Sequence, residues 1–442
     1  MKKPIILFSI ALLLLSFSET KSAFVDHALK LHWSYELGKT THRSEIAVLN
    51  NSLFIGSNGS HFMDWNLDDN NGVVQLNKKT GKKIRSLANE SFGDMDVNGI
   101  VSCNNTVIFG NDNDEILCYA DDGIQQWRIP TSGDVEHAPV ILKTKNHGSI
   151  VVFATEMGEV RALNPTNGNT IWKHYNEDFE GWKMGDNRTL FKVKMHFTSG
   201  MIYFSKPAIL DVNKDGTKDL IYGCNKSFIA ISGENGKVLW NHGIPEFQDH
   251  FSNNWRQTPN IVLIDGKPVI TLTYTHYQTN NLKIIQMNEK GEAITNKNFV
   301  YTSWGESLNH TPGFLYVSGM IVNLKTFEAQ RLPFYSKEKE NEKFRFSGDV
   351  QLSRERIKMD GEEAIGIVFQ HDSDIKNSSM FMLIGLETNT TYLKTLIPGG
   401  SEFTPVFQDF NQDGKIDLLI GSWNEQLYCY DLNISTNQLI KL

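Results

Sequence analysis

Short apolar runs alternate with polar turns along almost the whole chain. A run that closes on Gly is followed by a second apolar run and then by a turn, as in Leu53–Gly56, Val73–Leu76 and Lys79–Gly81. Runs of this length, bounded by turn residues, predict β-strands. No long helical periodicity competes with them. The pattern therefore predicts an all-β fold.

The same pattern recurs with turns near residues 81, 123, 168, 236, 291, 327, 389 and 433. The mean step of about fifty residues lies in the range of propeller blades. Pro opens the innermost run at several repeats, where a strand tolerates it: Pro139, Pro207, Pro259, Pro312 and Pro405. We predict a single β-propeller over residues 23–442 with eight four-stranded blades, seven being the alternative. The blades are expected near 45–88, 93–130, 137–175, 200–245, 257–300, 305–335, 345–395 and 402–433.

A ring of blades must close, because each blade buries its faces only on its neighbours. The segment Leu31–Gly38 precedes the first repeat but resembles the outer strands that follow later turns, such as the one containing Trp172. We therefore predict that residues 31–38 pair with the eighth blade and close the ring. The C-terminal Gln438–Leu442 is the alternative candidate for that place.

The N-terminus has the form of a secretory signal peptide. Lys2 and Lys3 precede the apolar run Pro4–Phe17, and the small and polar Ser18–Ala23 follows. The apolar run is too short for a spanning helix, so an uncleaved anchor is the lesser alternative. We predict a signal peptide over residues 1–22 and a mature protein, without a stable membrane span, that is secreted, periplasmic or held at the cell surface.

The charge of the chain bears on its binding partners, and its cysteines bear on disulfide formation. The formal net charge is −8 and no basic patch occurs, so nucleic acid is not an expected partner. The chain has four cysteines without metal-ligand spacing: Cys103, Cys118, Cys224 and Cys429. Export permits a disulfide between Cys103 and Cys118 if they lie on neighbouring strands. Buried free thiols are an equally good interpretation.

Two Asp-rich segments share the spacing D-x-N-x-D-G-x-x-D, at Asp211–Asp219 and Asp409–Asp417. Oxygen ligands at positions one, three, five and nine, with a backbone carbonyl at seven, form the environment that Ca²⁺ prefers. The predicted structural Ca²⁺ ligands are Asp211, Asn213, Asp215, Thr217 and Asp219 in loop one, and Asp409, Asn411, Asp413, Lys415 and Asp417 in loop two. The alternative is an Asx-rich hairpin without metal.

Position twelve of each loop, where an EF-hand needs Glu, is Tyr222 or Ile420 inside an apolar strand, which excludes an EF-hand. Two other blades give internal comparisons. The segment Arg356–Ala364 keeps only Asp-Gly and has basic residues at ligand positions, so we expect no ion there; Asp265-Gly266 predicts a plain hairpin. No His or nucleophile accompanies the Asp residues in the sequence, so we interpret both loops as structural clamps.

The segments 164–172 and 232–240, each a turn followed by Trp, resemble the repeat of quinoprotein-like (PQQ-type) β-propellers. The Asp loops with their flanking strands resemble the FG-GAP repeats of integrin α-chain propellers. Together the resemblances cover about residues 30 to 435, although blades five to seven match poorly. They imply a propeller with Ca²⁺ in the Asp loops and function on the opposite face. Quinone-dependent dehydrogenases use a vicinal Cys-Cys pair, which this chain lacks, so no PQQ is expected.

On the opposite face we expect the connections between second and third strands and between blades. They are rich in aromatic and polar residues that suit a protein or carbohydrate ligand. The candidate ligand-binding residues are His61, Trp65, Trp182, Trp255, Arg256, His276, Trp304, His310, His371 and Trp423. Packing between blades is the alternative role for each Trp.

We interpret the chain as an exported, monomeric, non-catalytic binding or scaffold propeller. A propeller hydrolase or lyase acting on polysaccharide is the enzymatic alternative, and a quinone-dependent dehydrogenase fits less well. No catalytic triad, HExxH or GxSxG motif supports an enzyme, so no catalytic residue is assigned.

Overall fold

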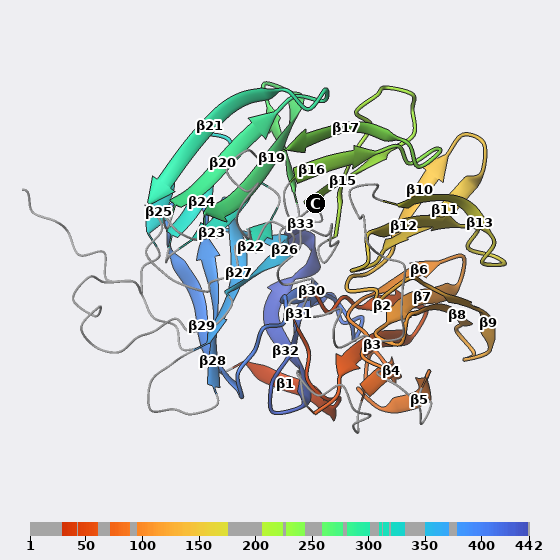
Figure 1. Ribbon diagram of the computed structural model, residues 1–442. Coiled ribbons are helices and arrows are strands. Elements are labelled where there is room, and N and C mark those ends of the chain that lie inside the picture. Colours follow the sequence, from red (N-terminus) through yellow and green to blue (C-terminus); the bar gives the residue numbers. More distant parts are fainter. Residues whose placement is uncertain are drawn as a thin grey trace, which may run out of the picture.

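The computed structural model describes residues 29–41, 43–60, 71–88, 95–175, 206–223, 227–243, 259–276, 281–300, 309–311, 313–317, 320–331, 350–370 and 378–440. The expected signal peptide lies outside these ranges. Eight antiparallel sheets surround a central axis (Figure 1). The predicted eight-bladed all-β propeller is confirmed. Within the described ranges, no helix has the length and apolar character needed to cross a membrane.

The first four blades follow one another along the chain, and each contributes four consecutive strands. They are β2 (Ala47–Leu49), β3 (Ser52–Asn58), β4 (Asn71–Asn77) and β5 (Lys83–Leu87); β6 (Ile100–Cys103), β7 (Thr106–Asn111), β8 (Glu115–Ala120) and β9 (Gln125–Pro130); β10 (Val140–Thr144), β11 (Gly148–Ala154), β12 (Glu159–Leu163) and β13 (Thr170–Tyr175); and β14 (Ala208–Leu210), β15 (Asp219–Gly223), β16 (Ser227–Ile231) and β17 (Val238–Gly243).

Blades five to seven continue in the same order, and blade eight ends the ring. They comprise β18 (Asn260–Ile264), β19 (Lys267–His276), β20 (Asn281–Met287) and β21 (Ala293–Val300); β22 (Asn309–Thr311), β23 (Phe314–Val317), β24 (Met320–Asn323) and β25 (Ala329–Arg331); β26 (Gln351–Met359), β27 (Glu362–Gln370), β28 (Ser378–Gly385) and β29 (Thr391–Pro398); and β30 (Val406–Gln408), β31 (Lys415–Gly421) and β32 (Gln426–Ser435).

The N-terminal strand closes the ring, as predicted. β1 (Lys30–Glu36) pairs antiparallel with β32 as the outer strand of blade eight, from Lys30 opposite Asp431 to Glu36 opposite Gln426. In Figure 1 the red β1 lies beside the blue β32.

The alternative in which the C-terminal segment closes the ring is wrong. After the 3₁₀ turn η4 (Thr436–Gln438), β33 (Leu439–Ile440) pairs with β26, the first strand of blade seven. Gln438 also donates a side-chain hydrogen bond to the Lys358 carbonyl at 2.9 Å. The first strands of neighbouring blades contact one another. The last described strand therefore lies at the inner edge of blade seven, beside β26.

The Gly–Trp repeat is explained by contacts between successive blades. Trp172 on β13 covers Gly236 in the next blade, where a Cβ atom would lie 2.5 Å from the indole, and its Nε1 donates to the Gly233 carbonyl at 3.1 Å. Trp127 covers Gly168 in the same way, and its Nε1 donates to the Pro165 carbonyl at 2.9 Å. Gly is required at both positions, because the backbone has a positive φ there and because a Cβ atom would occupy the space of the indole ring.

The same contact joins the two ends of the ring. Trp33 on β1 packs against Gly81 in blade one, where an added Cβ would approach the indole to 2.5 Å. Trp33 is 7% exposed and belongs to a core that spans blades one, seven and eight. The N-terminal strand thus completes blade eight through its backbone and fastens it to blade one through its indole.

Cys103 and Cys118 do not form a disulfide in the structure. Cys103 and Cys118 are free, buried thiols, which agrees with the second interpretation. They do not lie on neighbouring strands, because β7 separates β6 from β8. Burial raises the pKa of Cys118 to about 11, so this thiol is an unreactive core group. Cys224 lies outside the described residues.

Candidate functional site

Loop one connects the first two strands of blade four, and loop two occupies the same place in blade eight. In loop one, Asp219 begins β15, and its Oδ2 accepts backbone hydrogen bonds from Val212 at 2.9 Å and Asn213 at 3.4 Å. Asp211 Oδ2 accepts the backbone N–H of Gly216 at 3.0 Å. These bonds wrap the loop backbone around the first and last Asp of the motif.

Loop two repeats this arrangement. Asp417 Oδ2 accepts backbone hydrogen bonds from Phe410 at 2.8 Å and Asn411 at 3.3 Å, and Asp409 Oδ2 accepts one from Gly414 at 3.0 Å. The backbone also matches, with positive φ at positions four and six: 60° and 85° at Lys214 and Gly216, 64° and 85° at Gln412 and Gly414. The shared spacing therefore corresponds to one shared loop conformation in two blades on opposite sides of the ring.

Burial disfavours the ionised form of the last Asp in each loop, and a nearby positive charge would offset this effect. It raises the pKa of Asp219 to about 6 and that of Asp417 to about 6, even though backbone hydrogen bonds work in the other direction. One oxygen in each loop, Asp211 Oδ1 and Asp417 Oδ1, is buried and receives no hydrogen bond. A bound cation supplies what such oxygens lack. The donor set therefore fits a hard cation.

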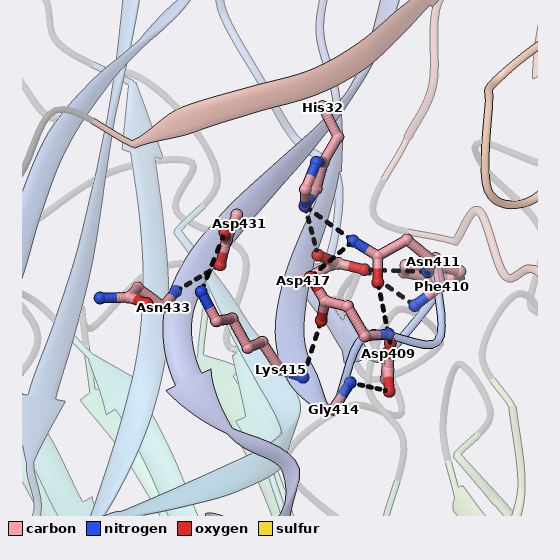
Figure 2. A network of polar contacts seen from close by, with 10 residues as sticks. His32, Asp409, Phe410, Asn411, Gly414, Lys415, Asp417, Asp431 and Asn433 are labelled. Carbon is pink, nitrogen blue, oxygen red and sulfur yellow. Dashed lines mark hydrogen bonds and ion pairs between the residues drawn. The ribbon is translucent and has the colours of Figure 1, made fainter.

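The loops differ in what faces the last Asp. In loop one, Asp219 Oδ1 accepts the backbone N–H of Gly233 at 3.2 Å. In loop two, the equivalent Asp417 Oδ1 faces His32 Nε2 at 3.1 Å instead (Figure 2). The interpretation that no His joins the Asp residues is wrong for loop two. His32 comes from β1, so its proximity arises only when the ring closes.

The comparison loops behave as plain hairpins. Asp265 and Gly266 both have positive φ, 50° and 72°, and join β18 to β19, as predicted. Asp360 and Gly361 make the equivalent turn between β26 and β27 with φ of 46° and 94°. Arg356, at the first position of this failed copy of the motif, pairs with Glu363 across the hairpin.

Two groups of metal-ligating side chains occur among the described residues. Each contains three ligand atoms that lie within 4.8 Å of one another: His32, Asp413 and Asp431 in the first, and Asp112, Asp134 and Glu136 in the second. The first group includes Asp413 of loop two. The second lies on the opposite face, where Glu136 is held by Arg43 and accepts a hydrogen bond from Asn98 at 3.1 Å.

The opposite face also holds a charged group that sequence reasoning missed. Glu45 lies just before β2, and its carboxylate accepts from Lys206 Nζ at 2.8 Å and Arg354 Nη2 at 2.6 Å. These residues come from the first strands, or their approaches, of blades one, four and seven. The only signal in the sequence is a charge beside each innermost run, which does not reveal that the three converge.

The polar group extends to His137 beside it. Its Nδ1 lies 2.9 Å from the Ala138 carbonyl, and its ring is 3% exposed. Burial lowers the pKa of His137 to about 4, so the imidazole is neutral at physiological pH. The described part of this face therefore has a neutral His next to one carboxylate that is paired with two cations.

Among the predicted ligand-binding residues, Trp423 is the one whose side chain lies in the described part of the structure. Trp423 lies in the β31–β32 loop on the opposite face, where it packs against Gly400. His276 and His310 lie on β19 and β22, and their side chains are outside the described part of the structure. The other candidates lie outside the described residues: His61, Trp65, Trp182, Trp255, Arg256, Trp304 and His371.

The chain matches a known protein family. A family model described as "Outer membrane protein assembly factor BamB" matches residues 30–206 and 69–318. The comparison with curated protein sequences found no match.

Solved structures share the fold at low identity. BamB from Moraxella catarrhalis is 11% identical with a TM-score of 0.50, over 91% of this chain and 100% of that one. The quinohemoprotein alcohol dehydrogenase ADHIIG from Pseudomonas putida HK5 is 13% identical with a TM-score of 0.60, over 92% and 77%. Sqt1 from Saccharomyces cerevisiae is 9% identical with a TM-score of 0.58, over 91% and 99%.

Proposed function

Because the chain belongs to the family of the outer membrane protein assembly factor BamB, we propose that it is an exported, non-catalytic propeller that binds a protein partner. The partner docks on the face opposite the Asp loops, and Ca²⁺ in those loops stabilises the blades. The observation that carries the proposal is the family match, which spans residues 30 to 318 in two overlapping segments.

The described part of the opposite face supports binding more than catalysis. Its ionised side chains engage one another, as in the contact of Glu45 with Lys206 and Arg354. Such prearranged pairs give electrostatic complementarity to a docked surface. A carbohydrate ligand is the second candidate, supported by Trp423, which lies in a loop on that face and is partly exposed.

Calcium is proposed for both loops. Asp211, Asn213, Asp215, Asp219 and the Thr217 carbonyl would hold the first ion, and the equivalent residues 409, 411, 413, 415 and 417 the second. The supporting observations are the shared loop conformation and the buried oxygens without donors. The ion supplies positive charge to these carboxylates and fixes the turn between the first two strands of each blade.

Adding Ca²⁺ to chelator-treated protein is expected to raise the melting temperature. At a hundred times the dissociation constant, a single site adds about 2.7 kcal/mol to the free energy of unfolding. Asp215→Ala removes a predicted ligand of loop one and is expected to remove part of this shift, measured by differential scanning calorimetry. The matched control is Asp265→Ala, in the plain hairpin of blade five. An unchanged melting temperature with both calcium and chelator would contradict the calcium proposal.

The binding face is tested by cross-linking in the living host. A photoreactive residue replaces Asn424, exposed in the β31–β32 loop, or Asn167, exposed at a turn on the Asp-loop face. We expect protein adducts from position 424 and at least about fivefold fewer from position 167, because a photoreactive group links only to a surface within its reach. Adducts confined to position 167 place the partner on the other face, and no protein adduct from either position contradicts a protein partner.

A further inference from the structure

The seam where the two ends of the chain meet contains an imidazole among carboxylates. His32 from β1, Asp431 from β32 and Asp413 from loop two place one ligand atom each within 4.8 Å of the others. The C-terminal segment also contacts this loop, because the Thr436 N–H donates to the Gly414 carbonyl at 3.0 Å. Figure 2 shows His32 directed at loop two from the neighbouring strand.

Two polar side-chain atoms lie at hydrogen-bond distance from His32 Nε2. Asn411 Nδ2 lies 3.0 Å from this nitrogen, and the contact is a hydrogen bond in the tautomer that has a lone pair on Nε2. The amide orientation is held by two other bonds, since Asn411 Oδ1 accepts from the Asp413 backbone at 2.9 Å and Nδ2 donates to Asp413 Oδ2 at 3.1 Å. With a lone pair on Nε2, the imidazole has no proton to offer Asp417 Oδ1 on its other side.

Asp417 Oδ1, which also supports a cation in loop two, is the second observation that points to a ligand at the seam. The Asp417 side chain is 0% exposed, and this oxygen receives no hydrogen bond although it lies 3.1 Å from His32 Nε2. Two ligands that bind one metal ion at about 2.1 Å, with an angle between 90° and 110°, are themselves about 3.0–3.4 Å apart. The separation of these two atoms therefore suits a shared cation.

From this geometry we propose a divalent transition-metal site at the ring closure, formed by His32, Asp413 and Asp431 with Asp417 Oδ1 beside the imidazole. An imidazole with carboxylates suits ions of the zinc class, whereas calcium takes oxygen ligands. Lys415 Nζ, 3.8 Å from Asp431 Oδ2, is the cation that now balances that carboxylate, and a metal ion would displace it. The Asn433 N–H, which donates to Asp431 Oδ1 at 2.6 Å, would keep orienting the ligand.

The bound ion would join the first strand to the last. Its ligands come from β1, from β32 and from the loop before β31, so separating β1 from blade eight would require breaking metal bonds. Loop one has no counterpart, because Gly233 N–H already occupies the equivalent Asp219 oxygen. The inference shares Asp413 and Asp417 with the calcium proposal for loop two, so a transition-metal ion at the seam would compete with Ca²⁺ there, whereas loop one would bind Ca²⁺ alone.

The test uses Co²⁺ as a spectroscopic probe on the chelator-treated full chain, followed by Zn²⁺ competition in the same cuvette. A nitrogen-containing site is expected to give a visible d–d band that Zn²⁺ abolishes. His32→Gln and, separately, Asp431→Asn are expected to weaken Co²⁺ binding by about tenfold or more. His147→Gln is the matched control, because His147 lies on an exposed turn of blade three.

The outcomes separate this inference from the calcium proposal. A Co²⁺ band that survives unchanged in both His32→Gln and Asp431→Asn overturns the site, as does the absence of any band in the wild type. Either result can occur while Ca²⁺ still stabilises the protein through loop one, a response that Asp215→Ala reports. Conversely, loss of the band in both seam variants but not in His147→Gln supports the site whether or not calcium binds.

Discussion

Replacing Trp172 by Ala is expected to lower the free energy of unfolding by about 3–5 kcal/mol. The indole is 8% exposed and belongs to the core between blades three and four. It covers the backbone at Gly236, and its Nε1 bonds the Gly233 carbonyl. Truncation therefore leaves a cavity between two blades and a buried carbonyl without its donor. Urea unfolding followed by tryptophan fluorescence and circular dichroism measures the loss.

Two further variants separate packing from hydrogen bonding at this contact. Trp172→Phe keeps most of the ring but removes the donor, so we expect a smaller loss, with about 1 kcal/mol of it from the hydrogen bond. Gly236→Ala tests the other side, because its Cβ would lie 2.5 Å from the indole at a φ of 73°. A Trp172→Ala variant as stable as the wild type would show that the Gly–Trp repeat is not a lock between blades.

The fold was predictable because each blade repeats its own local signals. Turn residues such as Gly168 and Gly236, followed by Trp at a fixed distance, report both a hairpin and a contact with the neighbouring blade. Ring closure by residues 31–38 followed from the same pattern, since Trp33 is an outer-strand Trp that precedes its blade. The loop conformation at positions one to nine is local too, and the shared spacing anticipated it.

What the sequence did not reveal depends on contacts between distant blades. His32 and Asn411 are separated by 379 positions, and they meet only because β1 returns to blade eight. The pairing of β33 with β26 rests on two residue pairs, which leave little pattern in so short a strand. Glu45 lies 161 positions from Lys206 and 309 from Arg354, so no local spacing signals their contact.

Replacing Glu45 by Gln is expected to lower the free energy of unfolding at pH 7 by about 1–3 kcal/mol. Removing one partner of a buried ion pair costs about 3–5 kcal/mol, and the smaller value follows because Lys206 and Arg354 side chains are 32% and 47% exposed while that of Glu45 is 14% exposed. The neutral amide leaves two cations facing each other near the axis, which holds blades one, four and seven together less well.

The stabilisation by Glu45 is expected to depend on pH, because this carboxylate contributes only when it is ionised. Burial alone would raise the pKa of Glu45, but Arg354 and Lys206 outweigh it and hold that pKa well below its ordinary value of 4.5. The ionised carboxylate therefore adds stability that is fully present above pH 4.5 and is lost as the pH falls toward the folded-state pKa. The difference in unfolding free energy between wild type and Glu45→Gln should stay constant between pH 6 and 8, where Glu is ionised in both states, and shrink in acid.

A control variant and a double-mutant cycle test whether the effect is specific to the contact across the ring. Glu387→Gln changes an exposed carboxylate in the turn after β28 and is expected to alter stability by less than about 0.5 kcal/mol. A double-mutant cycle of Glu45→Gln with Lys206→Met measures the coupling between blades one and four directly. A coupling energy near zero would mean that each blade is held by its neighbours alone. A coupling above about 0.5 kcal/mol shows that the ring is also braced across its axis, which keeps the docking face rigid when a partner binds.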